Sequence, residues 1–302
     1  MDSGDSRVIL LMAYGSPESN EEVMEYLRGI YHGRPVPQYA VEENRRKYAL
    51  FGGRSPSNAI IDSIVRKVGE AAPPGIPVVL GNKHWRPWLH DSLEYLTSQG
   101  ISRITAVPIF PFLSYNVEQS YLEPLTEFMD SSGSGAEIDF TNGFSSRPGF
   151  IDMWVRLIRE NWEKDEDTLV IFTAHSLPVH GQPEDNYVSA LRTSSGEIAS
   201  RCGISRYEWA FQSKGKYGDR WLEPSVESVV ENARGDYGKV LTVPVGFCYD
   251  HLEVLYDLDI VAGGTIRENG MSYQRIPLPN DSMDFVNLVL EVAGIGKPTQ
   301  EH

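Results

Sequence analysis

The sequence predicts an α/β protein made of two open parallel-sheet domains with flanking helices, related by internal duplication. Short apolar runs alternate with amphipathic segments along the chain, which is typical of βαβ units and a parallel sheet. Residues 7–17 resemble residues 168–178, and residues 104–110 resemble residues 240–247, which indicates the duplication. The length of 302 residues fits two domains of ~150 residues each.

The apolar runs give the strands in order, and an eighth, weaker run near Ile260 completes the second set. The seven clear strands are Arg7–Met12, Pro77–Leu80, Ile104–Val107, Ile138–Phe140, Thr168–Phe172, Tyr207–Phe211 and Val240–Val243. Apolar residues at helical spacing predict helices between them. These helices are Glu21–Ile30, Ala59–Val68, Trp88–Leu96, Val117–Met129, Phe150–Trp162 and Met283–Ala293. We therefore expect domains at 1–141 and 142–278, with a C-terminal helix and tail, 279–302, that pack back on the first domain.

Composition excludes several classes of protein. The chain has 27 Lys and Arg against 42 Asp and Glu, a formal charge of −15, which argues against a nucleic-acid partner and against reliance on anionic membranes. Two cysteines, Cys202 and Cys248, exclude a disulfide framework and a four-cysteine zinc or iron–sulfur site within one chain. The start is not cationic, and no run approaches the ~18 apolar residues of a membrane span. We expect a cytoplasmic protein without integral membrane association.

The common α/β motifs are absent. No G-x-G-x-x-G follows a strand, and neither G-x-x-x-x-G-K-[ST] nor G-x-S-x-G occurs, so nucleotide cofactors and serine-hydrolase chemistry lose their usual support. His251-Leu-Glu253 matches the start of a zinc-deaminase signature, but its P-C-x-x-C partner is missing.

Candidate functional side chains follow the predicted strands. Ligands of open parallel sheets bind at the carboxyl ends of the strands, where His175, Tyr14 and His84 are expected. An imidazole there can accept a proton or bind a metal, and a tyrosine oxygen can bind ferric iron. The alternatives are a loop histidine bonded to backbone and a half-buried tyrosine.

Acidic residues follow the strand Val240–Val243. Glu253 and Asp257 are four residues apart and share one face if the segment is helical. With His251 beside them, such carboxylates suit a hard or borderline cation. The alternative is an exposed acidic helix face.

Three further segments can contact a planar anion. Lys83–Trp88 mixes cations and indoles, Phe110–Tyr115 is aromatic, and Gly52–Pro56 begins a helix with Ser55 as its N-cap and Pro56 as its first residue. The free N–H groups at that helix start can hold a carboxylate. Core packing and plain capping are the alternatives.

Together these motifs resemble the ferrochelatase family over nearly the whole chain. The matching motifs are LLMAYGSP at 10–17, GGRSP at 52–56, KH at 83–84, TAHSLP at 173–178, FQSKG at 211–215 and VPVGFCYDHLEVLYD at 243–257. The resemblance implies two Rossmann-like domains of the chelatase type, with a porphyrin held between them, and insertion of ferrous iron in haem biosynthesis. The Tyr in MAYG makes the chain most similar to the coproporphyrin ferrochelatases.

The resemblance also assigns roles to residues. His175 and Glu253 match the inner pair that handles metal and protons, and Tyr14 matches the residue that reaches iron from the opposite porphyrin face. Further porphyrin-binding positions correspond to Tyr31, Lys47, Tyr48, Ser55, His84 and Tyr121. Two positions depart from the family pattern. Tyr31, with His32 and Arg34 nearby, stands where an arginine is expected, and Val261 stands where many relatives continue the acidic ladder past Asp257, a candidate outer metal relay.

From this resemblance we expect a lyase whose substrates are Fe²⁺ and a porphyrin, with coproporphyrin III preferred and protoporphyrin IX the alternative. It predicts no tightly bound cofactor, no iron–sulfur cluster and a monomeric chain. Two other functions remain open: a cobalt or nickel chelatase of the same superfamily, and a non-catalytic haem or porphyrin carrier. A carrier would bind haem without accelerating metal insertion.

Overall fold

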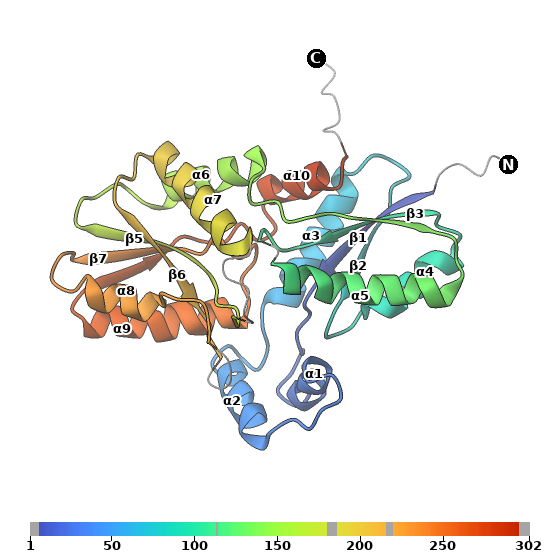
Figure 1. Ribbon diagram of the computed structural model, residues 1–302, viewed down its shortest axis with the longest axis horizontal. Helices are drawn as coiled ribbons and strands as arrows, with labels where there is room; N and C mark the ends of the chain where they lie inside the picture. Colours follow the sequence, from blue (N-terminus) through green and yellow to red (C-terminus); the bar gives the residue numbers. More distant parts are fainter. Residues whose placement is uncertain (1–5, 113, 180–185, 216–219, 296–302) are drawn as a thin grey trace, which may run out of the picture. The chain divides into compact units, whose positions relative to one another are not determined.

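A computed structural model describes residues 6–112, 114–179, 186–215 and 220–295. The chain divides into two compact units, each with one parallel sheet (Figure 1). The first unit takes residues up to 109, 116–143 and those from 280 onward, and the second takes 110–115 and 144–279.

The first sheet has four parallel strands in the order β2-β1-β3-β4. They are β1 (Arg7–Ala13), β2 (Val78–Asn82), β3 (Arg103–Pro108) and β4 (Glu137–Phe140). In β1 every side chain from Val8 to Ala13 is fully buried, which explains why this strand is apolar on both faces.

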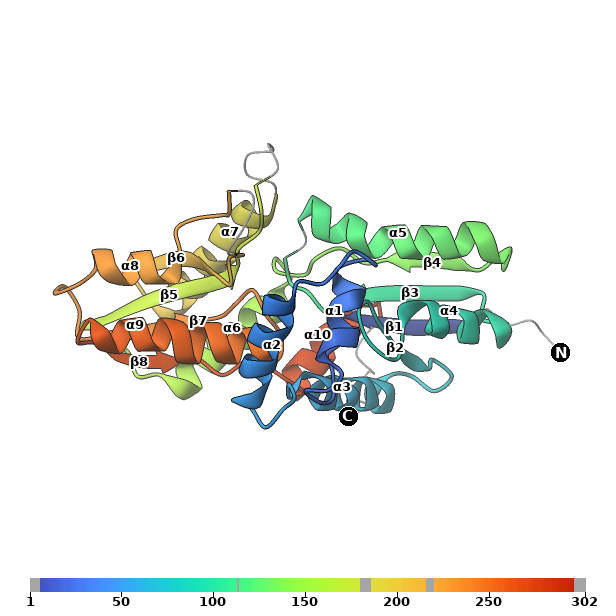
Figure 2. The same cartoon turned by 90° about the horizontal axis from the view of Figure 1, so that it is seen from below.

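Helices cover both faces of the first sheet. The crossover from β1 to β2 runs in the opposite direction along the sheet from the two that follow, so right-handed connections place α3 on one face and α4 and α5 on the other, as Figure 2 shows. The helices of this unit are α1 (Val23–Ile30), α2 (Gln38–Ala49), α3 (Ser57–Ala71), α4 (Leu89–Ser98), α5 (Tyr115–Ser132) and α10 (Met283–Val292).

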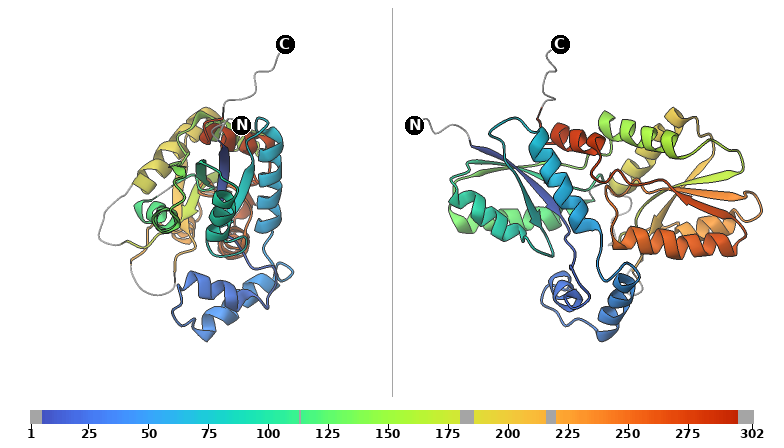
Figure 3. Two further views of the ribbon diagram at one scale, coloured as in Figure 1. Left: turned by 90° about the vertical axis from the view of Figure 1, so that its right-hand side faces the viewer. Right: turned by 180° about the vertical axis from the view of Figure 1, so that it is seen from behind.

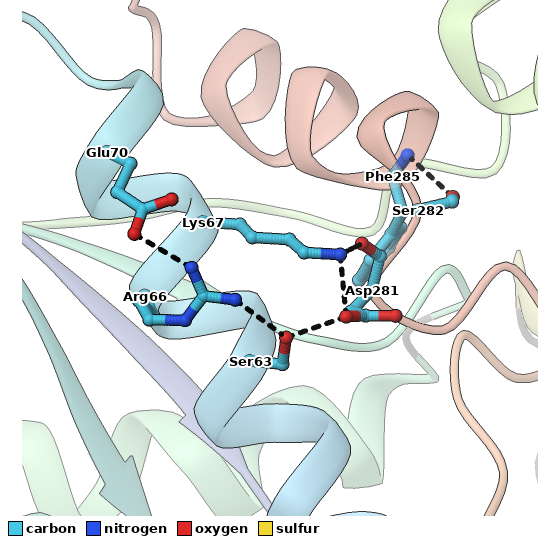
Figure 4. Close-up of polar contacts among 7 residues, drawn as sticks. All are labelled: Ser63, Arg66, Lys67, Glu70, Asp281, Ser282 and Phe285. Carbon is cyan, nitrogen blue, oxygen red and sulfur yellow. Dashed lines mark hydrogen bonds and ion pairs between the residues drawn. The ribbon is translucent and has the colours of Figure 1, made fainter.

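The C-terminal helix α10 packs against α3 in the first unit (Figures 1 and 3). Polar contacts fix the start of α10, as Figure 4 shows. Asp281 accepts hydrogen bonds from Ser63 Oγ (2.6 Å) and pairs with Lys67 Nζ (2.6 Å), while Lys67 also donates to the Asp281 carbonyl (2.7 Å). The Ser282 hydroxyl caps the helix by accepting the Phe285 N–H.

The second sheet repeats the strand order of the first, β6-β5-β7-β8, again all parallel. Its strands are β5 (Thr168–His175), β6 (Tyr207–Gln212), β7 (Lys239–Val243) and β8 (Ser272–Arg275). The flanking elements are α6 (Pro148–Asn161), α7 (Asn186–Cys202), α8 (Val226–Asn232), the π-helix η1 (Val254–Ala262) and α9 (Gly263–Glu268). The shared order agrees with a duplicated α/β unit.

Two local predictions are corrected. The strand expected near Ile260 is wrong, because this residue lies in η1, where Val254, Leu258 and Ala262 are buried four residues apart and Ile260 is 42% exposed. The last strand is β8 instead. Helix α3 begins at Ser57 rather than at Pro56, although the Ser55 hydroxyl still accepts the Ser57 N–H (3.2 Å).

Within the described ranges, the structure contains no helix with the length and apolar character that crossing a bilayer requires.

Candidate active site

His175 is the last residue of β5, and its backbone is held on both sides. The Tyr187 hydroxyl donates to the His175 carbonyl (2.8 Å), and the next N–H, that of Ser176, donates to the Gln212 carbonyl (2.7 Å). The ring atom Nδ1 contacts the Ser176 carbonyl oxygen. Because a carbonyl only accepts, Nδ1 carries the proton, and the other ring nitrogen, Nε2, keeps its lone pair in the neutral imidazole.

Glu253 faces that lone pair. Its Oε2 lies 3.5 Å from His175 Nε2, and the two side chains are 50% and 30% exposed. An imidazole nitrogen and a carboxylate oxygen at this separation can share a proton or hold a cation. In metal-binding histidines, the ring nitrogen that does not bind the metal usually donates its proton to a backbone carbonyl or a carboxylate, as Nδ1 of His175 does here.

A second imidazole lies beside this pair. The His251 ring contacts Phe247 (4.7 Å between ring centroids), and Phe247 also lies edge-on to His175 (6.5 Å). Burial lowers the pKa of His251 against the opposing effect of Glu253, so His251 is neutral near pH 7.

Asp257 lies one turn further along, in η1. Its carboxylate accepts a hydrogen bond from Ser213 Oγ. Ser213 has a φ of +62°, a left-handed conformation that a non-glycine residue rarely adopts. Ser213 follows β6 in the FQSKG motif, a signal to which the sequence alone assigned no role. Val261, at the departure from the family pattern, is 39% exposed.

The described residues contain no set of three His, Cys, Asp or Glu side chains placed to hold a metal ion. Within these ranges, His175 and Glu253 are brought together as a pair. Asp257 is not brought into a three-ligand cluster with them.

Tyr14 and His84 come together in the first unit, at the carboxyl ends of β1 and β2. Their ring centroids are 4.4 Å apart, and the Tyr14 side chain is 36% exposed while His84 is buried. The next residue, Gly15, lies close to Trp85: it has a φ of +83°, and a Cβ there would lie 2.6 Å from the Cβ of Trp85, so only glycine fits.

Burial shifts two pKa values beside Tyr14. Burial, with the charges of Lys83 and His32, lowers the pKa of His84 to about 3, against a hydrogen bond to the Gly29 backbone. Burial likewise lowers the pKa of Lys83 to about 8, opposed by Glu123. The Lys83 ammonium lies 5.0 Å from the centroid of the Tyr121 ring, a cation–π contact.

The remaining predicted residues all lie in the first unit and differ in exposure. Tyr48, Ser55 and Tyr121 are buried, and the Tyr48 hydroxyl is 3.2 Å from the Ser16 hydroxyl. Lys47, on α2, and Tyr31, which follows α1, are partly exposed. His175, Glu253 and Asp257 belong to the second unit, so the candidate residues form one group in each unit.

Sequence comparison identifies the family. The ferrochelatase family model matches residues 6–294. A ferrochelatase of Thermoplasma acidophilum is 42% identical over 285 residues, covering 94% of this chain and 89% of that protein. A coproporphyrin III ferrochelatase of Listeria monocytogenes is 31% identical over 297 residues, covering 94% and 96%.

Solved structures share the fold at low sequence identity. The cobalt complex of the sirohydrochlorin chelatase SirB from Bacillus subtilis subspecies spizizenii has a TM-score of 0.56 at 11% identity, covering 96% of this chain and 94% of that chain. CbiX, the terminal enzyme of sirohaem biosynthesis in denitrifying bacteria, has a TM-score of 0.57 at 13% identity, covering 95% and 98%. With a family match that spans the two sheets and all the candidate residues, the chain belongs to the ferrochelatase family.

Proposed function

We propose that this chain inserts ferrous iron into a porphyrin, with His175 as the proton acceptor and Glu253 as its partner. One observation carries the proposal: Nε2 of His175 and Oε2 of Glu253 are 3.5 Å apart, and Nδ1 is already committed to the Ser176 carbonyl. The family membership supplies the reaction class.

The chemistry balances with these two groups. A free-base porphyrin carries two inner N–H protons, and both must leave when Fe²⁺ enters as a dication. The lone pair of His175 Nε2 takes the two protons one after the other and passes each to solvent, which reaches the pair because the two side chains are 30% and 50% exposed. The neighbouring Glu253 carboxylate lowers the free-energy cost of the imidazolium that forms each time. The same two atoms can briefly hold Fe²⁺, whose borderline character suits imidazole and carboxylate.

Tyr14 is proposed to approach the iron of the product from the other face of the porphyrin. Its 36% exposure and its packing on His84 support this role, because the ring is fixed while part of the side chain stays accessible.

The variant Tyr14→Phe tests this role, because it removes the hydroxyl oxygen and keeps the ring. It should change the visible spectrum of the ferric haem complex and leave part of the insertion activity; identical product spectra would place Tyr14 away from the metal.

We propose coproporphyrin III as the preferred ring. It carries four propionates, whereas protoporphyrin IX has two, and exposed cations in the first unit can pair with them. These cations are Arg34, Arg45, Arg46, Lys47 and Arg54, of which Lys47 is half-buried. The net charge of −15 repels a tetra-anion. Salt screens this repulsion beyond roughly 8 Å at physiological ionic strength, so the cations near the ring determine its affinity.

We extend the proposal to cofactors, oligomeric state and location in the cell. Iron is a substrate rather than a resident cofactor, no tightly bound group is required, and the chain acts as a monomer in the cytoplasm. Only two cysteines, Cys202 and Cys248, are present, which supports a chain without an iron–sulfur cluster of its own.

The deciding experiment is steady-state insertion of Fe²⁺ into both porphyrins under anaerobic conditions without detergent. We expect a higher kcat/KM for coproporphyrin III. His175→Ala should abolish insertion while porphyrin still quenches protein fluorescence on binding. Haem binding without any metal insertion would instead show a carrier, and faster insertion of Co²⁺ or Ni²⁺ into a more reduced tetrapyrrole would show a different chelatase.

A triple variant tests the ring preference. Neutralising Arg45, Arg46 and Lys47 together should raise KM for coproporphyrin more than for protoporphyrin, because more carboxylates lose a partner. The matched control neutralises Lys164, Arg206 and Arg234, which precede strands of the second sheet and lie at the edge opposite His175. Equal KM changes for both rings, or equal effects in the control, would refute the preference.

A further inference from the structure

Arg275 contacts the segment that carries Glu253 at two points, one on either side of that residue. Its Nη2 lies 3.1 Å from Asp250 Oδ1, three residues before Glu253. Its Nε and Nη2 lie 2.8 Å and 3.1 Å from the two carboxylate oxygens of Asp259, six residues after Glu253. One guanidinium thus joins the loop before η1 to the helix itself.

The contacts are well enclosed for an ionic group. The Arg275 side chain is 14% exposed, and those of Asp250 and Asp259 are 20% and 35% exposed. The Tyr273 hydroxyl supports the same carboxylate, donating to Asp259 Oδ1 (3.3 Å), and lies 3.1 Å from Thr242 Oγ1. Charged pairs with this geometry and burial are more rigid than surface pairs, because Arg presents a planar, bidentate fork.

Arg275 also links this segment to the strand that carries His175. It is the last residue of β8, paired with Thr242 of β7, and β7 pairs in turn with β5, which ends at His175. The same sheet therefore holds His175, at the end of β5, and Arg275, at the end of β8, from which Arg275 contacts Asp250 and Asp259.

We propose that Arg275 is a positioning residue for metal insertion: by clamping Asp250 and Asp259 to β8, it sets the distance between Glu253 and His175. This role rests on the proposed function of that pair. A loop held at one end only would let Glu253 move, and displacement of a reacting group by about 1 Å can cost roughly 100-fold in rate.

Two variants test the clamp. Arg275→Lys keeps the charge but loses the bidentate fork that holds the two oxygens of Asp259. Asp250→Asn, which is close to isosteric, removes the ion pair at the other end of the clamp. The control is Arg267→Lys, the same chemical change at an exposed arginine of α9, which lies 5.6 Å from the Tyr273 ring centroid.

The first readout is amide hydrogen exchange over residues 249–262, which does not depend on catalysis. Both clamp variants should exchange faster there than the wild-type chain, with strand β5 unchanged. The second readout is steady-state insertion: kcat should fall by about tenfold or more while KM for porphyrin stays within about twofold. The control should match the wild type in both.

Unchanged exchange over 249–262 in both variants would overturn the clamp, and so would faster exchange with unchanged kcat. A wild-type chain that inserts no ferrous iron would refute the proposed function instead, and the exchange measurement alone would then decide whether Arg275 holds the segment. If Arg275→Lys does not fold, Asp250→Asn decides both readouts.

Discussion

His175 is fixed by three hydrogen bonds that involve neither metal nor porphyrin. The Tyr187 hydroxyl, the Gln212 carbonyl through the Ser176 N–H, and the Ser176 carbonyl itself all act on it or on its backbone neighbour. The imidazole therefore presents Nε2 without the need for a partner to orient it. The proton-accepting role that we propose for Nε2 needs this organisation, because a base contributes most when it is positioned before substrate binds.

Glu253→Gln should separate proton handling from porphyrin binding. The amide keeps the shape of the carboxylate but cannot stabilise an imidazolium, so kcat should fall by roughly 100-fold while KM for porphyrin changes less than about threefold. Glu268→Gln, at an exposed position in α9, is the control and should leave both constants unchanged. An effect confined to porphyrin KM would make Glu253 a substrate-positioning residue.

His84 predicts a pH dependence of stability. Its pKa is lowered to about 3 in the folded chain, by burial first, against an ordinary value near 6.5. Between about pH 3 and pH 6.5, the unfolded chain therefore binds a proton at His84 that the folded chain does not bind. Stability from this group is complete above pH 6.5 and is lost as pH falls toward 3, by a few kcal/mol in all.

Urea unfolding of His84→Gln at several pH values checks this. Gln retains an N–H that can reach the Gly29 carbonyl but does not titrate. Between pH 7 and pH 4.5 the variant should lose less free energy of unfolding than the wild-type chain. His90→Gln, at an exposed position on α4, should follow the wild type; the same slope in all three proteins would contradict the assignment.

Among the elements, α10 depends on a small polar cluster at its first turn (Figure 4). The Asp281 carboxylate is held by Lys67 and Ser63 of α3, and these hydrogen bonds lower the pKa of Asp281. The pair is 28% and 37% exposed, so its contribution is small. Asp281→Asn should lower the free energy of unfolding at pH 7 by about 1 kcal/mol.

The matched control for that variant lies on α3, the helix that Asp281 contacts. Glu70→Gln breaks the exposed pair with Arg66 (2.8 Å), and it should change stability by less than about 0.5 kcal/mol. Chemical denaturation at pH 7 measures both. Equal losses in the two variants would show that the Asp281 contacts add nothing beyond an ordinary surface pair.

The strands were predictable where burial is complete on both faces. β1 and β5 are almost wholly buried, so their apolar runs stand out in the sequence. β8 was missed because Ser272–Arg275 alternates between exposed and partly exposed positions and contains no aliphatic residue. Helix α2 was missed for a related reason: only Ala40, Val41 and Tyr48 are buried, too few to give a helical stripe. Both elements are specified by their neighbours more than by their own residues.

The candidate site also contains residues that the sequence identified and contacts that it could not predict. His175 and Glu253 were identifiable because His175 ends a buried apolar strand, Glu253 lies in a long, specific motif, and the family resemblance is confirmed. The supporting contacts were not. Ser213 and Asp257 are 44 residues apart, and Arg275 lies 25 residues after Asp250, so only the folded sheet brings them together. The roles of His175, Glu253, Tyr14 and Asp257 toward the metal stay predictions, and so do the porphyrin-binding roles of the other residues. These are Tyr31, Lys47, Tyr48, Ser55, His84 and Tyr121.

At the scale of the whole molecule, the two sheets have the same strand order, but the two units are assembled differently from segments of the chain. The second unit consists of residues 144–279 and the short segment 110–115, whereas the first unit is completed only when α10 returns from the far end of the sequence. Six side chains of α10, Phe285 among them, are at most 6% exposed. The first unit therefore depends on contacts that form after the second unit has been synthesised.

Phe285→Ala should consequently weaken the first unit selectively. Phe285 is fully buried, and its truncation should cost about 3–5 kcal/mol, a large part of the stability of a single domain. Amide hydrogen exchange under native conditions should show loss of protection in β1 and β3 but not in β5 and β7. Met283→Ala, at a 53% exposed position of the same helix, should leave both sheets protected. Equal loss of protection in both sheets would instead show that the two units unfold as one cooperative structure, since a local defect then lowers the stability of every amide that opens by global unfolding.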